Sequence, residues 1–188
     1  VEATYIENIT TTVAEATLRD YADQGYDLIC GWSFDMGDYI MKVAPDYPDT
    51  KFVWSQGYMT LDNMATVSAP LQETAYLCGM IAAGMSETGV IGYIGGMDVP
   101  AVIRFGYGFI QGAEYAAQEM GVEVEMKYWY SYSFNPSDDI KNKAASWYTE
   151  GTEVIFSCGG GIYNSVVAAA EEGNGKVVGV DSDQAHVS

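Results

Sequence analysis

The chain has few basic residues. Eight Lys and Arg stand against 26 Asp and Glu, which gives a formal net charge of −18 at pH 7. Nucleic acids and anionic membrane surfaces are bound through basic patches, so this balance argues against both partners. It does not indicate disorder, because 48% of the 188 residues are hydrophobic and can form a substantial core. An acidic, well-solvated surface is the plain explanation.

Cysteine and histidine are also scarce. Cys30, Cys78, Cys158 and one histidine occur without a CxxC or any other metal-binding spacing, so no metal site is expected. Each cysteine lies in an apolar stretch, where an inert core thiol is the expected state. Neither a G-x-G-x-x-G after the first strand nor a G-x-x-x-x-G-K-[ST] motif is present, so no nucleotide cofactor is expected.

Long apolar runs are absent too. The run around residues 77–85 is too short to span a bilayer. Because the chain begins with Val rather than Met, we expect any signal or anchor sequence to lie outside it.

The hydrophobic pattern predicts strands alternating with helices, which indicates parallel sheets with helices on both faces. The helix over 71–85 is apolar on nearly all sides, as is typical of a helix buried between two layers or crossing between lobes. Helices are expected over 11–22, 36–43, 71–85, 100–120, 137–149 and 162–172, and strands over 26–30, 51–54, 63–68, 90–94, 122–129, 154–157 and 177–180.

The order of elements repeats along the chain. The stretch GYDLICG at 25–31 is mirrored by GTEVIFSCG at 151–159, and each is followed by a helix and a short strand. This similarity fits either βαβ units that have converged on the same pattern or two similar lobes that meet at a cleft. The second interpretation predicts an N-terminal lobe over 1–86 and a second lobe over 87–180. Residues 181–188 would then begin a crossover back to the first lobe.

The most informative stretch is GVDSDQ at 179–184, where an expected strand ends in Asp181 and Asp183. Ligands of open α/β sheets bind at the carboxyl ends of the strands. A carboxylate there accepts hydrogen bonds from ligand hydroxyls. A charge at the end of a buried strand is costly unless it is partnered, so Asp181 is the residue least readily explained as structural.

Other strand ends supply aromatic rings, carboxylates and bare backbone, and no cluster of Lys or Arg for a phosphate. The expected ligand is therefore small, neutral or cationic, with a ring and hydroxyls. Core packing of the aromatics, helix capping by Asp35 and Asp98, and a tight turn at 159–161 are the structural alternatives. The candidates are Trp32, Ser33, Phe34, Asp35, Ser55, Gln56, Gly96, Met97, Asp98, Tyr130, Tyr132, Phe134, Gly159, Gly160, Gly161, Asp181 and Asp183.

A catalytic interpretation rests on Ser33, Asp181 and His186, which follow the chain order of an α/β-hydrolase triad. The stretch GWSFD at 31–35 lacks the second glycine of the G-x-S-x-G elbow, and His186 follows Asp181 by only a few residues. We therefore do not expect an enzyme.

Several motifs together resemble one family. They are YPDTKF at 47–52, ETAYLCG at 73–79, IGYIGGMD at 91–98 and GVDSDQ at 179–184. They are similar to the BMP family, the basic membrane lipoproteins that serve as substrate-binding components of nucleoside ABC transporters. The resemblance covers nearly the whole chain. It implies a type I periplasmic-binding fold, in which two doubly wound parallel-sheet α/β lobes close on a purine nucleoside in a central cleft.

The resemblance also implies roles for particular residues. The Asp that opens the Asp-Ser-Asp-Gln motif holds ribose hydroxyls in the family, which implicates Asp181. The backbone of Gly159 and Gly160 would approach the sugar. An aromatic residue after the strand over 122–129 would stack on the base, and the sequence leaves this role open. The candidates for it are Trp129, Tyr132 and Phe134.

The chain departs from the family pattern in places. The family's opening strand is not matched, and the part with a Lys that reaches the ribose would lie after Ser188. Ser55 and Gln56 stand where many members carry an Asp, and SCGGG at 157–161 differs from the usual Ala-Gly-Gly-Thr-Gly. We therefore expect either a fold incomplete at both ends or a divergent member with another ligand.

The resemblance predicts a non-enzymatic, extracytoplasmic solute-binding protein, either a cell-surface lipoprotein or periplasmic. Ligand binding would close the lobes, and a membrane permease would recognise the closed form. No cofactor and no nucleic-acid partner are expected. A ligand-sensing domain of a regulator or receptor with the same fold is the first alternative, and an α/β hydrolase is the second.

Overall fold

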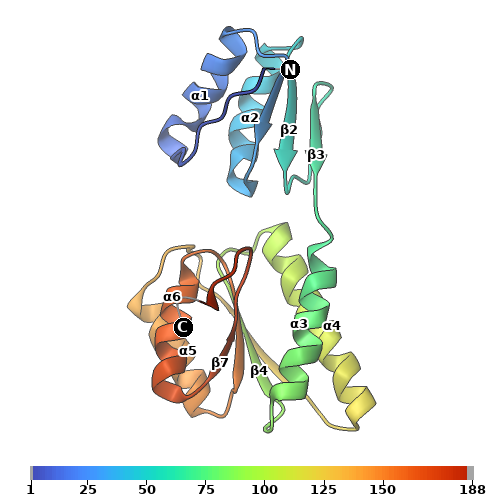
Figure 1. Ribbon diagram of the computed structural model, residues 1–188, viewed down its shortest axis with the longest axis vertical. Helices are drawn as coiled ribbons and strands as arrows, with labels where there is room; N and C mark the ends of the chain where they lie inside the picture. The colour runs from blue at the N-terminus through green and yellow to red at the C-terminus, as the bar shows by residue number, and fades with distance from the viewer. Residues whose placement is uncertain (1, 186–188) are drawn as a thin grey trace. The chain divides into compact units, whose positions relative to one another are not determined.

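The computed structural model describes residues 2–185. Contacts between residues divide the chain into two compact units, with the division between Ala69 and Pro70. Each unit has a parallel sheet of its own (Figure 1). The expected alternation of strands and helices is confirmed in both.

The first unit contains a three-stranded sheet of order β1-β2-β3. Ile29, Phe52 and Met64 lie in register across the three strands and pack against helices α1 and α2. Its elements are α1 (Thr11–Asp23), β1 (Leu28–Gly31), the 3₁₀ helix η1 (Phe34–Met36), α2 (Gly37–Val43), the 3₁₀ helix η2 (Ala44–Asp46), β2 (Lys51–Ser55) and β3 (Met64–Val67).

The other face of this sheet is open among the described residues. Leu28 and Val67 are each 54% exposed, and Cys30 beside them is exposed as well. Among the described residues, helices therefore cover only one face of the sheet of the first unit. The prediction of a buried thiol at Cys30 fails for the same reason, since alternation along β1 turns its side chain to the uncovered face.

The second unit contains a four-stranded sheet of order β5-β4-β6-β7, covered on both faces. Tyr93 and Phe156 pack with α3 and α4, whereas Ile94 and Ile155 pack with α5 and α6. The two helix pairs lie on opposite sides of the sheet (Figure 1). Its elements are α3 (Leu71–Met85), β4 (Val90–Gly95), α4 (Pro100–Met120), β5 (Glu125–Tyr130), α5 (Asp138–Thr149), β6 (Val154–Cys158), α6 (Ile162–Gly173) and β7 (Lys176–Val178).

Helix α3 belongs to the second unit because it packs against α4 at backbone distance. A methyl group on Gly79 would overlap the carbonyl of Phe109, and one on Gly112 would overlap that of Tyr76. Glycine lets two helices approach this closely. The boundary between the units, expected near Glu87, therefore lies before α3. The units run over 1–69 and 70–188 instead of 1–86 and 87–180.

Two strand limits also differ from the prediction. Strand β5 begins at Glu125 rather than Val122, because Gly121 ends α4 with φ +69° and the Val122 N–H still bonds to the carbonyl of Ala117. Strand β7 ends at Val178 rather than Val180, because the Val180 N–H donates to the side chain of Gln184.

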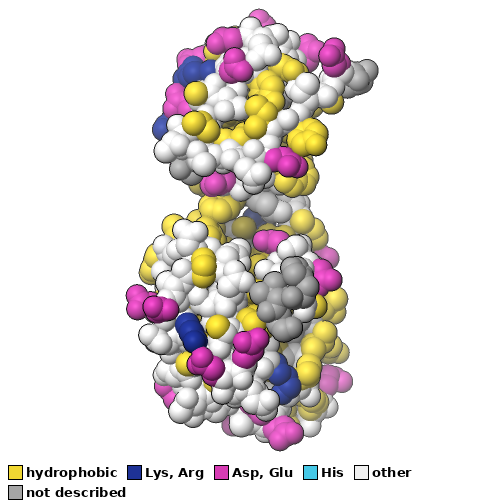
Figure 2. All heavy atoms as spheres, turned by 60° about the vertical axis from the view of Figure 1, so that its left-hand side comes forward, with side chains coloured by type: hydrophobic (Ala, Val, Ile, Leu, Met, Phe, Trp, Pro, Cys, Tyr) yellow, Lys and Arg dark blue, Asp and Glu magenta, His cyan; other side chains and the backbone are white. Residues whose placement is uncertain are grey.

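Acidic side chains are spread over the face shown in Figure 2, where basic side chains are few. Several of the basic groups are engaged in ion pairs. Arg19 donates a hydrogen bond to Asp46 at 2.8 Å and another to Glu15, and the two bonds raise the pKa of its guanidinium. In the part of the chain that the structure describes, no helix combines the length and apolar character required to cross a membrane.

Candidate functional site

The carboxyl edge of the second sheet brings together the loops that follow β4, β5, β6 and β7, because all four strands are parallel. The loops after β4 and β6 touch through their backbones. The Gly96 N–H donates to the Cys158 carbonyl at 2.9 Å, and a Cβ on Gly159 would lie 3.0 Å from the Gly96 backbone. Gly96 and Gly159 are buried in this contact, and the backbone that stays exposed beside them is that of Gly160.

Three of these loops each contain a residue in the left-handed region. The φ angles are +54° at Tyr132, +51° at Gly160 and +66° at Asp181. Such angles are costly for non-glycine residues, and residues of this kind cluster at ligand-binding sites. Three loops at the carboxyl edge therefore share this backbone conformation.

Asp181 sits at the centre of a tight turn, in which the Ser182 N–H donates to the Val180 carbonyl at 2.8 Å. Its side chain is exposed, so the expected cost of a charge at a buried strand end does not apply. Neighbouring protein atoms still shield part of the carboxyl from water, and this desolvation raises its pKa above the ordinary value. The carboxylate is available to a ligand from solvent.

Cys158 lies beneath this edge and is not a reactive thiol. Burial raises its pKa to about 12, and the negative charge of Asp181 adds to the effect. The hydroxyl of Tyr93 nearby donates to the Val102 carbonyl at 2.6 Å. Burial also raises the pKa of Tyr93 and of Tyr130. These groups stay neutral at physiological pH, which argues against nucleophilic chemistry here.

The three aromatic candidates for stacking have different surroundings. Trp129 lies within β5, is partly buried against the α5–α6 core, and has the Lys143 ammonium 5.7 Å from its ring centre. Phe134 is partly buried, and its ring fills the space that a side chain on Gly96 would need. Tyr132 is 67% exposed. Of the three, Tyr132 is therefore the most exposed to solvent.

Met97 and Asp98 follow β4, and Asp98 is exposed. The expected capping role of Asp98 is wrong, since the N-cap of α4 is Val99 and makes no side-chain capping bond. Asp35 lies inside η1 rather than capping it, because the N-cap there is Ser33. Both carboxylates thus lack the structural role that was the alternative to ligand binding.

At the carboxyl edge of the first sheet, Trp32 is 79% exposed, Phe34 is half-buried and Ser55 is buried. Gln56, which follows β2, has a positive φ of +62°. Its Oε1 is buried and has no hydrogen-bond partner among the described residues. Only the position after a strand could have pointed to it, because the left-handed backbone is not visible in the sequence.

The structure does not support the hydrolase interpretation. Ser33 has φ −173°, which is ordinary extended backbone, whereas a nucleophile elbow holds its serine in a strained turn. His186 lies outside the described residues. Within residues 2–185, no group of three or more His, Cys, Asp and Glu side chains is placed to hold a metal ion.

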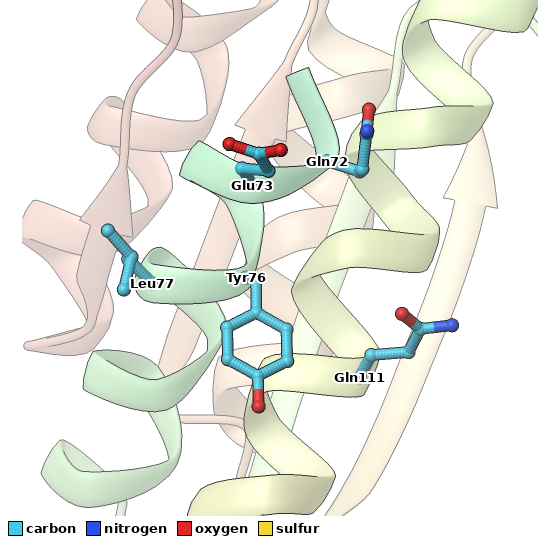
Figure 3. A pocket seen from close by; sticks show the side chains of 5 residues that line it. All are labelled: Gln72, Glu73, Tyr76, Leu77 and Gln111. Carbon is cyan, nitrogen blue, oxygen red and sulfur yellow. The ribbon is translucent and has the colours of Figure 1, made fainter. Parts of the chain in front are cut away.

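A shallow hollow lies at helices α3 and α4, and the residues that line it are Gln72, Glu73, Tyr76, Leu77 and Gln111 (Figure 3). Tyr76 stands over it, with its ring 6.0 Å from that of Tyr115. The hollow is wide open to solvent. It lacks the enclosure of a small-molecule site.

Comparison with known proteins identifies relatives of the whole chain. The sequence profile of PnrA-like ABC transporter substrate-binding proteins, the Bmp family, matches residues 1–188. A purine-binding protein of Brucella abortus is 35% identical over 156 residues, which cover 82% of this chain and 43% of that protein. The nucleoside-binding protein BmpA of Lactococcus lactis is 28% identical over 193 residues, or 98% and 54% of the two chains.

A solved structure agrees with these relatives. An ABC transporter solute-binding protein of Aeropyrum pernix superposes with a TM-score of 0.78 at 30% identity, covering 93% of this chain and 52% of that one. The chain therefore spans about half the length of the curated relatives it matches. The resemblance drawn from the sequence motifs and the periplasmic-binding fold it implied are both confirmed, and the chain belongs to the Bmp family of PnrA-like ABC transporter substrate-binding proteins.

Proposed function

We propose that this chain is part of the extracytoplasmic substrate-binding component of an ABC transporter and that its ligand is a purine nucleoside. Membership of the Bmp family supports the transport role, and the family is one of binding proteins rather than enzymes. The names of the relatives from Brucella abortus and Lactococcus lactis support the ligand class. The partner would be a membrane permease, and the protein would be periplasmic or anchored at the cell surface.

The observation that carries the ligand proposal is the arrangement at the carboxyl edge of the second sheet. Asp181 offers an exposed carboxylate on a strained turn, and the backbone of Gly160 is exposed after the neighbouring strand, whereas Gly159 is buried against Gly96. The ring of Tyr132 is exposed on the loop after β5. A sugar needs acceptors for its hydroxyls, and a purine needs a flat apolar face.

Within this proposal the residues have separate roles. Asp181 accepts hydrogen bonds from ribose hydroxyls, the glycine backbone lies against the sugar, and Tyr132 stacks on the base. We propose Met97, Asp98, Trp32, Phe34 and Ser55 as further contact residues on the grounds of their positions at or just after the carboxyl ends of strands. A neutral ligand fits because no Lys or Arg follows β4, β6 or β7 within these loops.

Isothermal titration calorimetry of the full-length protein tests the proposal. The titrants are adenosine, inosine and guanosine, with adenine, hypoxanthine and ribose as controls that each lack half of the ligand. The proposal expects at least one nucleoside to bind far more tightly than its free base or ribose. Binding of a monosaccharide with no nucleoside bound would overturn the ligand class. Binding of none of these compounds would overturn the proposed function in this form.

A further inference from the structure

The turn at Asp181 has to be held in place by its surroundings. Asp181 is a non-glycine residue at φ +66°, and the hydrogen bond from the Ser182 N–H to the Val180 carbonyl closes a three-residue γ-turn around it. A γ-turn with positive φ is rare and strained. Such a conformation persists only where neighbouring groups fix it.

The side chain of Gln184 supplies that constraint. Its Oε1 accepts a hydrogen bond from the Val180 N–H at 2.9 Å, which takes the donor that would otherwise extend strand β7. Its backbone carbonyl accepts from the hydroxyl of Tyr163 at 3.3 Å. Tyr163 lies on α6 and is only 6% exposed, so it ties the turn to the core of the unit.

The start of the turn is equally constrained. Val180 is 7% exposed and packs in the core between the sheet and helices α3 and α4. A methyl group on Gly179 would overlap Gln184 Oε1, so the glycine leaves the room that the amide of Gln184 occupies. The buried Val180 and the amide of Gln184 thus hold both sides of Asp181, leaving its carboxylate outside.

We propose that Gln184 is a positioning residue, whose side chain holds Asp181 in the left-handed turn and thereby sets ligand affinity without touching the ligand. The part about the turn stands on contacts within the second unit. The part about affinity rests on the proposed function, in which Asp181 accepts hydrogen bonds from the ligand.

The turn is tested first, without any ligand. Gln184→Met keeps the length of the side chain and removes the acceptor, and Gln118→Met makes the same change at an exposed position of α4. In the full-length protein, NMR hydrogen exchange of the Val180 and Ser182 amides should become about tenfold faster in Gln184→Met, the factor that corresponds to one lost hydrogen bond. Gln118→Met should leave both rates unchanged. Unchanged exchange in Gln184→Met would overturn the proposal.

The link to affinity is tested by a double-mutant cycle, with adenosine, inosine and guanosine as probes. Gln184→Met should weaken nucleoside binding about tenfold in the wild-type background and less than about twofold when Asp181 is already Ala. A purely structural role predicts the same loss in both backgrounds, and that result would contradict the proposal.

Two further outcomes remain decisive. If Gln184→Met does not fold, Tyr163→Phe removes only the hydroxyl that holds the Gln184 carbonyl. It should give the same pattern at a smaller size, about twofold to threefold in exchange and affinity. No change in either quantity would then overturn the proposal. If the wild-type protein binds none of the nucleosides, the proposed function fails, and the exchange measurement alone decides the role of Gln184 in the turn.

Discussion

The two sheets of the molecule differ in how they are covered. In the second unit, every residue of β6 from Val154 to Cys158 is buried, because helices pack on both faces. In the first unit, burial alternates along β1, so that Leu28 and Cys30 are exposed while Ile29 is buried. These two strands lie in the stretches of sequence that mirror each other most closely.

This difference shows that a similar apolar strand can serve two architectures. Parallel strands with both faces covered carry continuous apolar runs, whereas a one-faced sheet carries alternating ones. LIC at 28–30 and VIF at 154–156 are both continuously apolar. The sequence of β1 is therefore that of a strand covered on both sides, while the described residues cover only one.

The largest expected effect is on the unfolding free energy, when matched side chains of β6 and β1 are shortened to alanine. Ile155→Ala empties a site with 0% exposure and should cost about 2–5 kcal/mol of unfolding free energy. Leu28→Ala removes the corresponding aliphatic bulk at a site with 54% exposure and should cost less than about 1 kcal/mol. Urea titration of both variants measures the difference. An equal loss at Leu28 would mean that the open face is covered in solution.

A smaller effect on stability tests whether α3 belongs to the second unit. Gly112→Ala places a methyl group against the carbonyl of Tyr76 and should destabilise the protein by about 2–3 kcal/mol. Gly84→Ala, also in the helix pair, meets nothing within 4 Å and should stabilise it by about 0.5–1 kcal/mol through helix propensity. Thermal unfolding compares the two. Tolerance of Gly112→Ala would argue that α3 and α4 separate in solution.

The fold could be predicted largely from the sequence because periodicity and motif order depend on local pattern. The limits of helix α3 match the prediction, and most strands lie within a residue or two of it. The boundary between the units could not be predicted in the same way. It depends on how closely Gly79 and Gly112 let two helices approach, which is a tertiary contact between distant residues.

The site could be predicted only in part. Its position after the strands follows from parallel topology, which is also what predicts a role for Asp181. Which aromatic ring faces solvent depends on the turn at Tyr132 and on the packing of Phe134 against Gly96. The contribution of Gln184 was hidden as well, because a side chain that replaces a strand partner leaves no pattern in the sequence.

The central claim is that Asp181 recognises the hydroxyls of a nucleoside, and Asp183 provides a matched control two residues away. The Oδ1 of Asp183 accepts from the Ala185 N–H at 3.0 Å, which engages it within its own turn. Calorimetry of the two alanine variants in the full-length protein compares them directly. Asp181→Ala should lose about 1.5–3 kcal/mol of binding free energy, and Asp183→Ala less than about 0.5 kcal/mol. Unchanged affinity in Asp181→Ala, with a wild-type protein that binds the nucleoside well, would contradict the account.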